Sequence, residues 1–284
     1  MTQASYIMES EDEALRLDLK TNPDALKRQV LWAGLEKGMR VADLGCGPGK
    51  TSFYLNRIVQ PGGSVLAVDI SPQRIAYAKD HYETAGLHFV QQDIRQPMDH
   101  LGRFDFIWMR FVLEHYRTNG AAMVANAAKI LKPNGILCLA DLDHNCLNHH
   151  GLSWRLESAI AGIMEALKGH KNFDPYAGRK LYAYLYDLGF REIRVAVEAH
   201  HLLYGELGDE DTFNWRKKID IAARHAGYAF PEYTDGITGF QKDSATFFDD
   251  PRRFTYTPII VCRGRKPDTP VDAACPESPM MSAR

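Results

Sequence analysis

Short apolar runs alternate with amphipathic stretches through the first half of the chain. Five of the apolar runs have the length of buried strands: residues 39–45, 63–71, 87–94, 103–110 and 135–143. Helical spacing is found over residues 11–37, 50–59, 72–86 and 121–133, with Pro23 beginning a second helix and Pro133 ending the last. This alternation predicts a doubly wound α/β fold, in which helices cover both faces of a mostly parallel sheet.

The alternation of strands and helices ends near residue 143. Two further strands are expected at 191–203 and 256–265, which brings the sheet to seven strands. The core is therefore expected over three ranges: 26–143, 176–202 and 256–265. Helical insertions at 144–175 and 203–255 are expected to cover a ligand site, and residues 266–284, rich in Pro, Ser and Ala, are expected to be disordered.

The second insertion is rich in aromatic residues. Some of them must form a small satellite core, but aromatic side chains above the carboxyl edge of a sheet also line ligand pockets. We therefore expect a small apolar or aromatic ligand at this end of the sheet. The residues concerned are Tyr204, Phe213, Trp215, Tyr228, Phe230, Tyr233, Phe240, Phe247 and Phe248.

Composition narrows the class of protein without identifying it. The chain has 284 residues, 45% of them hydrophobic and 25% charged, with a formal net charge of -2, which is typical of a globular protein. No basic stripe indicates a nucleic-acid partner, and no apolar run is long enough to cross a bilayer. The acidic first twenty residues do not resemble a secretory signal, and the five cysteines form no C-x-x-C pair. A reducing cytoplasm is expected, without a metal site.

A glycine-rich loop, "VADLGCGPGKTS", follows the first expected strand at residues 41–52. A phosphate loop would need glycine at position 44, where the chain has Leu44. A dinucleotide loop would need glycine at position 50, where the chain has Lys50. The remaining pattern, D-x-G-x-G-x-G, turns sharply and exposes backbone to a ligand without requiring that the ligand carry phosphate.

This loop resembles the first motif of the Rossmann-like, class I S-adenosylmethionine-dependent methyltransferases of the small-molecule type. Four more stretches match that family in order: "VLAVDIS", "FVQQDIRQ", "FDFIWMRFVLEHY" and "ILKPNGILCLAD", the last with Asn134 in place of a glycine. The resemblance covers about residues 6 to 143. It implies S-adenosyl-L-methionine as cofactor and methyl transfer to an O, N or C atom of a small molecule.

The resemblance also implies which residues bind the cofactor. Asp43 would face the ammonium group of the methionine moiety, and Asp69 would accept hydrogen bonds from both ribose hydroxyls. Asp93 would meet the adenine amino group, although all three acids could instead cap turns or helices. The other implied residues are Tyr6 in an N-terminal cap over 1–25, and Gly45, Cys46, Gly47, Gly49, Ile70, Arg74, Ile94, Arg110, Phe111 and His115.

Two histidines are candidates for general-base catalysis. His144 follows the fifth expected strand, where loops of this fold border the substrate, and a phenol or carbon acid would require such a base. His115 follows Glu114 at an expected helix start, and it is either a base or a structural neighbour of the cofactor. His144, His149 and His150 together lack the carboxylate partner and regular spacing of a metal site.

Three other functions stay open at this stage. An NAD(P)-dependent oxidoreductase shares the loop and the ribose acid, but the chain has no Tyr-x-x-x-Lys pair near the fifth strand. A non-catalytic partner protein could keep the cofactor fold. A nucleic-acid methyltransferase that targets amino groups would carry [DN]-P-P-[FYW] after the fourth strand, where this chain has "MRFVLEH". The expected partner is a small-molecule acceptor, with a homodimer as the candidate assembly.

Overall fold

The structure is a computed structural model that describes residues 22–145 and 147–268. Its strands are β1 (Arg40–Leu44), β2 (Ser64–Asp69), β3 (Leu87–Gln91), β4 (Phe104–Arg110), β5 (Leu131–Leu142), β6 (His149–His150), β7 (Arg191–Tyr204) and β8 (Phe254–Arg265). Its helices are α2 (Pro23–Ala33), α3 (Lys50–Val59), α4 (Pro72–Tyr82), α5 (Gly120–Lys129), α6 (Trp154–His170), α7 (Leu181–Asp187), α8 (Asp209–His225) and α9 (Ile237–Asp249). Three short 3₁₀ helices are η1 (Asp99–Leu101), η2 (Leu113–His115) and η3 (Gly178–Lys180).

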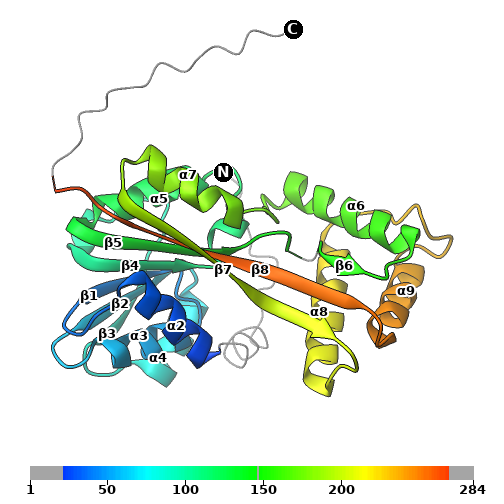
Figure 1. Cartoon of the computed structure of the whole chain (residues 1–284), viewed down its shortest axis with the longest axis horizontal. Helices are drawn as coiled ribbons and strands as arrows, with labels where there is room; N and C mark the ends of the chain where they lie inside the picture. Colours follow the sequence, from blue (N-terminus) through cyan, green and yellow to red (C-terminus); the bar gives the residue numbers. More distant parts are fainter. Residues whose placement is uncertain (1–21, 146, 269–284) are drawn as a thin grey trace, which may run out of the picture.

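The strands form one sheet in the order β3-β2-β1-β4-β5-β8, with β7 and the short β6 both paired to β8 (Figure 1). Strands β1 to β5 are parallel, whereas β8 runs antiparallel to β5, β6 and β7. The predicted doubly wound, mostly parallel α/β fold is confirmed. The described residues hold eight strands instead of seven, because β6 has only two residues and is too short to give a periodic pattern.

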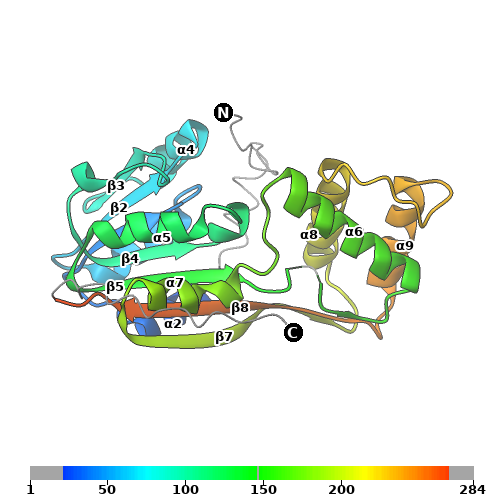
Figure 2. The same cartoon turned by 90° about the horizontal axis from the view of Figure 1, so that it is seen from above.

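Alternate residues of the central strands pack into two different apolar layers. In β4, Phe106 and Trp108 face the layer that holds α2, α3 and α4, whereas Ile107 and Met109 face the layer that holds α5 and α7. Figure 2 shows α2 and α5 on opposite sides of the sheet. Burial of both faces explains why these strands appear in the sequence as continuous apolar runs.

A third apolar cluster lies beyond the carboxyl ends of the parallel strands. It is built from α6, α8 and α9, and its fully buried or nearly buried members include Leu156, Ile163, Trp215 and Phe240. The long strands β7 and β8 extend past the core and carry this cluster, as Figure 1 shows. We call α6, α8 and α9 the roof.

The prediction that the helix after the fourth strand continues to Pro133 is wrong. Helix α5 ends at Lys129, and β5 already begins at Leu131, which pairs with Phe104. Proline disfavours helical backbone in the residue before it, so the chain leaves the helix early. Asn134 takes the left-handed backbone expected of a residue that replaces glycine, with φ of 59°.

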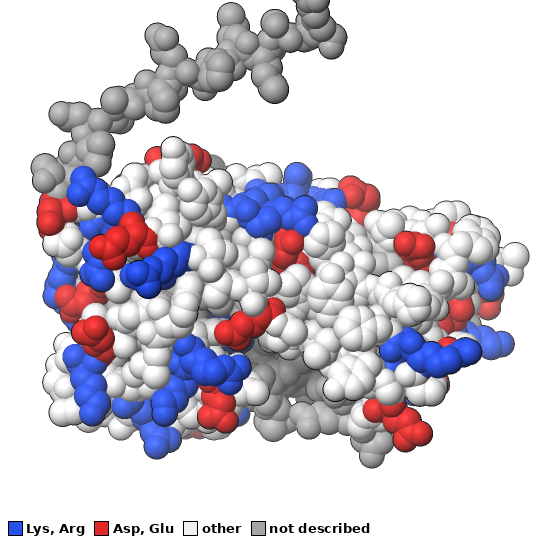
Figure 3. Space-filling view, in the orientation of Figure 1, with Lys and Arg blue, Asp and Glu red and all other residues white. Residues whose placement is uncertain are grey.

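Strand β7 forms an edge of the sheet, since within the described residues it pairs only with β8. Several of its apolar side chains are exposed, Val197 to 64% and Tyr204 to 65%. The face with β7 in front shows basic and acidic residues interspersed around a largely uncharged middle (Figure 3). Among the described residues, no helix has the length and apolar character needed to span a bilayer. The homodimer and the cytoplasmic location stay predictions.

Candidate active site

Glycine is required twice in the loop after β1. Gly45 has φ of 81°, and a Cβ atom there would lie 2.4 Å from Cγ2 of Val112. Gly49 has φ of 96° and precedes α3, and its Cβ would lie 2.8 Å from Cβ of Ala78. Only glycine combines this left-handed backbone with such close packing, so the sequence fixes the path of the loop.

Gly47, between them, faces open space. It has φ of 55°, no atom lies within 4 Å of the Cβ it would carry, and the residue lines a large cavity. Its backbone N–H donates to Oδ2 of Asp69 at 2.9 Å. The absence of a side chain at Gly47 leaves room for a ligand directly against the backbone.

The amides of this loop are already used within the protein. Gly45 and Cys46 both donate to the carbonyl of Val68, at 2.7 and 2.9 Å, and Gly49 donates to the carbonyl of Cys46 at 3.2 Å. With Gly47 bonded to Asp69, no amide from Gly45 to Gly49 points at a ligand, since Pro48 has none. A pyrophosphate would therefore find no nest of donors here.

Asp69 ends β2 and is 5% exposed. Besides accepting from Gly47, its carboxylate accepts a hydrogen bond from the N–H of Ser71 at Oδ1, 2.9 Å away. Nη1 of Arg74 lies 4.0 Å from the same oxygen. Ile70 follows Asp69 and lines the cavity beside it.

Asp43, near the end of β1, is 2% exposed and accepts a hydrogen bond from the hydroxyl of Ser52 at 2.6 Å. Burial raises the pKa of Asp43 to about 7, and the charge of Asp69 adds to this, whereas the Ser52 hydrogen bond and the charge of Arg110 oppose it. A cationic group bound beside Asp43 would favour its ionised form.

Asp93 follows β3 and is bound by its neighbour Arg95. Nε of Arg95 donates to Oδ1 at 2.9 Å and Nη2 donates to Oδ2 at 2.8 Å. Burial alone would raise the pKa of Asp93, but the hydrogen bonds and charge of Arg95 outweigh it and the pKa is lowered. Asp93 and the buried Ile94 both line the cavity, although both oxygens of Asp93 already accept from arginine.

Arg110 and Phe111 lie where β4 ends. The guanidinium carbon of Arg110 lies 4.1 Å from the centre of the Phe111 ring, which in turn lies 4.8 Å from the ring of His200 on β7. Burial lowers the pKa of Arg110 to about 10, although the carboxylates of Asp43, Asp141 and Glu198 favour its charged form. Phe111 has φ of 57°, an uncommon backbone for a bulky residue, which is held by its N–H bond to the carbonyl of Ala140.

Glu114 and His115 lie in the 3₁₀ helix η2 instead of opening α5 as expected. Oε1 of Glu114 lies 3.6 Å from Nε2 of His115, and Oε2 accepts from the side chain of Asn145 at 2.8 Å. The turn itself is held by Asp141, whose Oδ2 accepts from the amides of Leu113 and Glu114 at 2.8 and 3.2 Å. Burial and the charge of Glu114 raise the pKa of Asp141 well above its ordinary value.

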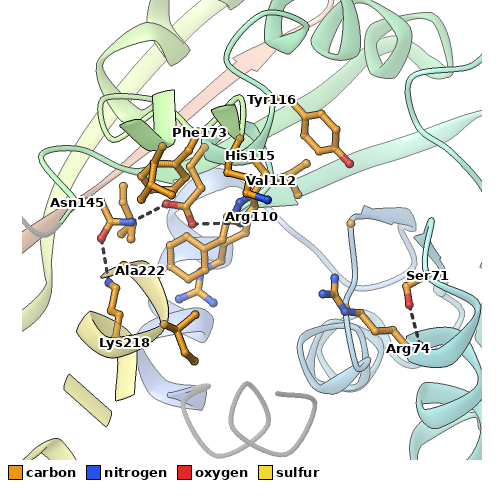
Figure 4. Close-up of a pocket in the computed structure, with 18 of the residues that line it drawn as sticks. Ser71, Arg74, Arg110, Val112, His115, Tyr116, Asn145, Phe173, Lys218 and Ala222 are labelled. Atoms are coloured by element: carbon orange, nitrogen blue, oxygen red, sulfur yellow. Dashed lines mark hydrogen bonds and ion pairs between the residues drawn. The ribbon is translucent and has the colours of Figure 1, made fainter. Parts of the chain in front are cut away.

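These groups meet in one cavity of about 670 Å³ between the sheet and the roof. Asn145 links the two sides, because its Oδ1 accepts a hydrogen bond from Lys218 of α8 at 3.0 Å (Figure 4). Apolar side chains close the cavity on the roof side; they include Ile163, Met164, Leu167, Trp215, Ile219 and Phe240. The cavity is therefore polar where the parallel strands end and mostly apolar opposite.

The structure brings most of the expected site residues to this cavity, but not His144. Its backbone has φ of 49°, and its ring packs edge-on against Tyr176 at 5.1 Å and does not line the cavity. His149, from the same cluster, does line it, with Nδ1 2.8 Å from Oγ1 of Thr255. Tyr6 lies outside the described residues, and among the residues that are described no group of three or more potential ligands is arranged to hold a metal ion.

Sequence patterns did not identify Asn145 or Lys218 as site residues. Asn145 directly follows His144, in the loop where a base was expected, and Lys218 lies one helical turn after Trp215. Neither position belongs to a motif, and only the approach of α8 to the end of β5 joins them.

The family profile described as "Methyltransferase domain" matches residues 35–185 of this chain. The chain belongs to this family, the class I S-adenosylmethionine-dependent methyltransferases that its motifs and sheet indicate. The alternative of an NAD(P)-dependent oxidoreductase is not supported, in agreement with the occupied amides of the loop.

Curated relatives share part of the chain. A ubiquinone biosynthesis O-methyltransferase of Rhodopseudomonas palustris strain TIE-1 is 32% identical over 110 residues, which are 38% of this chain and 42% of the relative. Another, from Rhodopseudomonas palustris strain BisB18, is 37% identical over 112 residues, 38% of this chain and 41% of the relative. The chain thus spans about two fifths of the length of these relatives.

Solved structures share the fold. A Bacillus halodurans protein provisionally named a methyltransferase superposes with a TM-score of 0.56 at 17% identity, covering 86% of this chain and 99% of that one. The Haemonchus contortus phosphoethanolamine N-methyltransferase 2, in complex with S-adenosylhomocysteine, gives a TM-score of 0.52 at 17% identity, covering 86% of this chain and 52% of that one. These likenesses support the fold.

The residues at the ends of β1 and β2 fit S-adenosylmethionine. This cofactor is cationic and has no phosphate, and the cavity offers it the carboxylates of Asp43 and Asp69 next to the open space at Gly47. Ile70 and Ile94 add apolar surface for a flat ring. A buried acidic rim with no spare amide donors suits a cation better than a pyrophosphate.

Proposed function

We propose that this protein transfers the methyl group of S-adenosylmethionine to a hydroxyl oxygen of a small aromatic or apolar molecule. The observation that carries the proposal is one continuous cavity of about 670 Å³, which joins the acidic loop region after β1 and β2 to an apolar roof. A cofactor and a small acceptor can share such a space, whereas a polymer would need an open groove.

Oxygen is proposed as the acceptor atom for two reasons. The curated relatives are ubiquinone biosynthesis O-methyltransferases, although the match covers 38% of this chain. The cavity also holds His115 beside Glu114, a pair that can take a proton from a hydroxyl group.

Cofactor binding is assigned to residues of the core sheet. Asp43 would pair with the ammonium group, Gly45, Gly47 and Gly49 would let the methionine moiety lie along the loop, and Asp69 would bind the ribose. S-adenosylmethionine supplies an activated methyl group on a cationic sulfur. The remaining task of the protein is to align the acceptor oxygen and exclude water, which lowers the barrier by positioning.

His115 is proposed to hold the proton that leaves the acceptor hydroxyl. Glu114 lies on one side of the imidazole and would stabilise its protonated form. Asn145 holds Glu114 in place, and Lys218 holds Asn145. The position of His144 against Tyr176 offers no such arrangement.

Residues 144–175 and 203–255 are proposed to act as the acceptor cover, since α6, α8 and α9 supply the apolar side of the cavity. Their aromatic residues lie in both of the places anticipated for them, a satellite core and the wall of a cavity. Phe230 and Phe247 belong to the apolar cluster of the roof, while Trp215 and Phe240 also line the cavity. An N-terminal cap over residues 1–25 remains a prediction.

Mass spectrometry tests the proposed function. Purified protein is incubated with S-adenosylmethionine and a panel of catechols, phenols, hydroxybenzoates and aromatic amines. We expect a methyl gain on at least one hydroxylated compound and none on the same compound with its hydroxyls already methylated. Transfer to amines alone, or no transfer by a protein that binds S-adenosylhomocysteine, would contradict the proposal.

A further inference from the structure

Arg110 presents to the cavity a cation whose buried N–H has no hydrogen-bond partner in the described part of the chain. Among the described residues its Nε is buried without a hydrogen-bond partner, and no carboxylate lies within ion-pair distance of the guanidinium. Its recorded contact is the face of the Phe111 ring at 4.1 Å. Leaving this N–H unpaired away from water is costly, and the other four N–H donors of the guanidinium can also bind an anion.

The surroundings of Arg110 keep it charged. Asp43, Asp141 and Glu198 all favour the cation, and none of them is bonded to it. Each already has a partner: Asp43 accepts from Ser52, Asp141 from backbone amides and Glu198 from Gln29. The guanidinium fork is therefore available for an anion that enters the cavity.

The side chain of Arg110 lies between the end of β1, where Asp43 is its strongest charged neighbour, and the roof. In Figure 4 its guanidinium lies on the side of Lys218 and Ala222 and away from Ser71 and Arg74, which mark the end of β2. The ring under it, Phe111, begins a chain of neighbouring rings. It leads to His200 at 4.8 Å, then to His201 at 4.2 Å, and from there to Trp215 at 5.1 Å.

Carboxylates gather at the end of the cavity formed by β1, β2 and β3, although Lys50 and Arg74 line that end as well. Asp43, Asp69 and Asp93 come from the ends of β1, β2 and β3. The opposite side contributes the cations Lys171 and Lys218, with Nζ of Lys218 5.1 Å from the centre of the Trp215 ring. Among the described residues near the roof, the cations Arg110, Lys171 and Lys218 outnumber the one carboxylate, Glu114, and aromatic rings line the mostly apolar wall, which favours a flat anionic molecule.

We infer that the methyl acceptor is an aromatic carboxylic acid whose carboxylate binds Arg110 and whose ring packs along the wall formed by Phe111, His200 and Trp215. This inference rests on the proposed function. Bidentate pairing with arginine would fix the orientation of the ring, and Lys218 would add positive potential without leaving Asn145.

The carboxylate site can be tested without turnover. Matched acids and amides are bound to the protein saturated with S-adenosylhomocysteine. Calorimetry would compare hydroxybenzoates, hydroxyphenylacetates and hydroxycinnamates with the corresponding amides. We expect at least one acid to bind about tenfold more tightly than its amide, and Arg110→Gln to abolish the difference while the affinity for the amide changes by less than about twofold. If no acid binds more tightly than its amide, or if Arg110→Gln preserves the preference, the inference is wrong.

Two controls test whether the preference for acids depends specifically on Arg110, and whether Arg110 binds the cofactor instead of the acceptor. Arg263→Gln removes another buried arginine that does not line the cavity, so the preference for the acid should persist. S-adenosylhomocysteine and methylthioadenosine, which lacks the amino-acid carboxylate, are titrated into the Arg110→Gln variant. Selective loss of S-adenosylhomocysteine affinity would show that Arg110 serves the cofactor and would overturn the inference. Methylation of neutral phenols alone would also overturn the inference and leave the proposed function standing. Acid binding through Arg110 without any methyl transfer would support the acid site and contradict the proposed function.

Discussion

The side-chain amide of Asn145 donates to Oε2 of Glu114 at 2.8 Å, and this contact ties the end of β5 to the turn after β4. Through Lys218, whose Nζ lies 3.0 Å from Oδ1 of Asn145, the same amide reaches the roof. One buried asparagine therefore connects the turn that carries His115 with the helix that closes the cavity.

We expect Asn145→Ala to destabilise the protein and slow methyl transfer. Glu114 and Lys218 would each lose a hydrogen bond in a buried region, which costs about 1–3 kcal/mol of unfolding free energy. The turnover number should fall by about tenfold, because Glu114 would no longer be held beside His115. Urea unfolding and initial rates measure the two effects. Gln60→Ala, which removes side-chain bonds to Asn56 and Gly63 outside the cavity, should affect stability alone.

Asp43→Asn should make the cofactor-free protein more stable at high pH. Burial raises the pKa of Asp43 to about 7, whereas an aspartate in an unfolded chain titrates near about 3.9. The folded state retains a proton that the unfolded state has released, so stability falls as pH rises from about 4 to about 7. Asparagine removes this loss, which at about pH 8 amounts to at most roughly 4 kcal/mol.

Denaturant unfolding of both proteins at about pH 5.5 and about pH 8 measures this effect. The difference in unfolding free energy between wild type and Asp43→Asn should be larger at the higher pH. Asp105→Asn provides the opposite case, because Lys132 and Arg40 overcome burial and lower the pKa of Asp105. That variant should be less stable than wild type at about pH 8. A stability gain of Asp43→Asn that is equal at both pH values would argue against the raised pKa.

Gly45→Ala should mainly reduce stability, whereas Gly47→Ala should mainly weaken cofactor binding. At Gly45 a methyl group would meet Val112 at 2.4 Å, so the variant should lose stability, and shortening the neighbour in Gly45→Ala/Val112→Ala should restore part of it. At Gly47 no neighbour lies within 4 Å, so the cost is limited to the left-handed backbone, about 1–2 kcal/mol. Its methyl group would instead occupy ligand space and weaken S-adenosylhomocysteine binding.

Thermal unfolding and calorimetry distinguish the two variants. A Gly47→Ala protein with unchanged cofactor affinity would mean that the ligand does not lie against the loop.

His115→Asn should lower the turnover number by about a hundredfold at neutral pH, since the acceptor proton would lose its base. Affinity for S-adenosylhomocysteine should stay close to that of wild type. His144→Asn should leave turnover unchanged, because this ring packs on Tyr176 outside the cavity. Rates measured across pH with a confirmed acceptor decide the matter, and equal losses in both variants would remove the assignment to His115.

Much of the cofactor side could be predicted from the sequence because its residues follow strands directly. The apolar run that forms β1 and the three glycines after it determine a local turn. Because β1, β2 and β4 are parallel, their carboxyl ends meet at one edge of the sheet. Asp43, Asp69 and Arg110 line the cavity for that reason.

The acceptor side depended on contacts between distant parts of the chain. Asn145 and Lys218 are separated by 73 positions and meet only because β7 and β8 carry the roof back over the sheet. Within the histidine cluster, the pattern could not tell which side chain faces inward. His144 itself has a left-handed backbone, and its ring packs against Tyr176. The two-residue strand β6 places His149 against Thr255.

Titration calorimetry with S-adenosylhomocysteine and with NADH tests the central claim most directly, namely that the loop after β1 and the carboxylate of Asp69 form a site for S-adenosylmethionine. We predict that the purified protein binds one molecule of S-adenosylhomocysteine per chain, does not bind NADH, and loses at least about tenfold in affinity with Asp69→Ala. A folded protein that binds NADH, or that does not bind S-adenosylhomocysteine, would contradict the account.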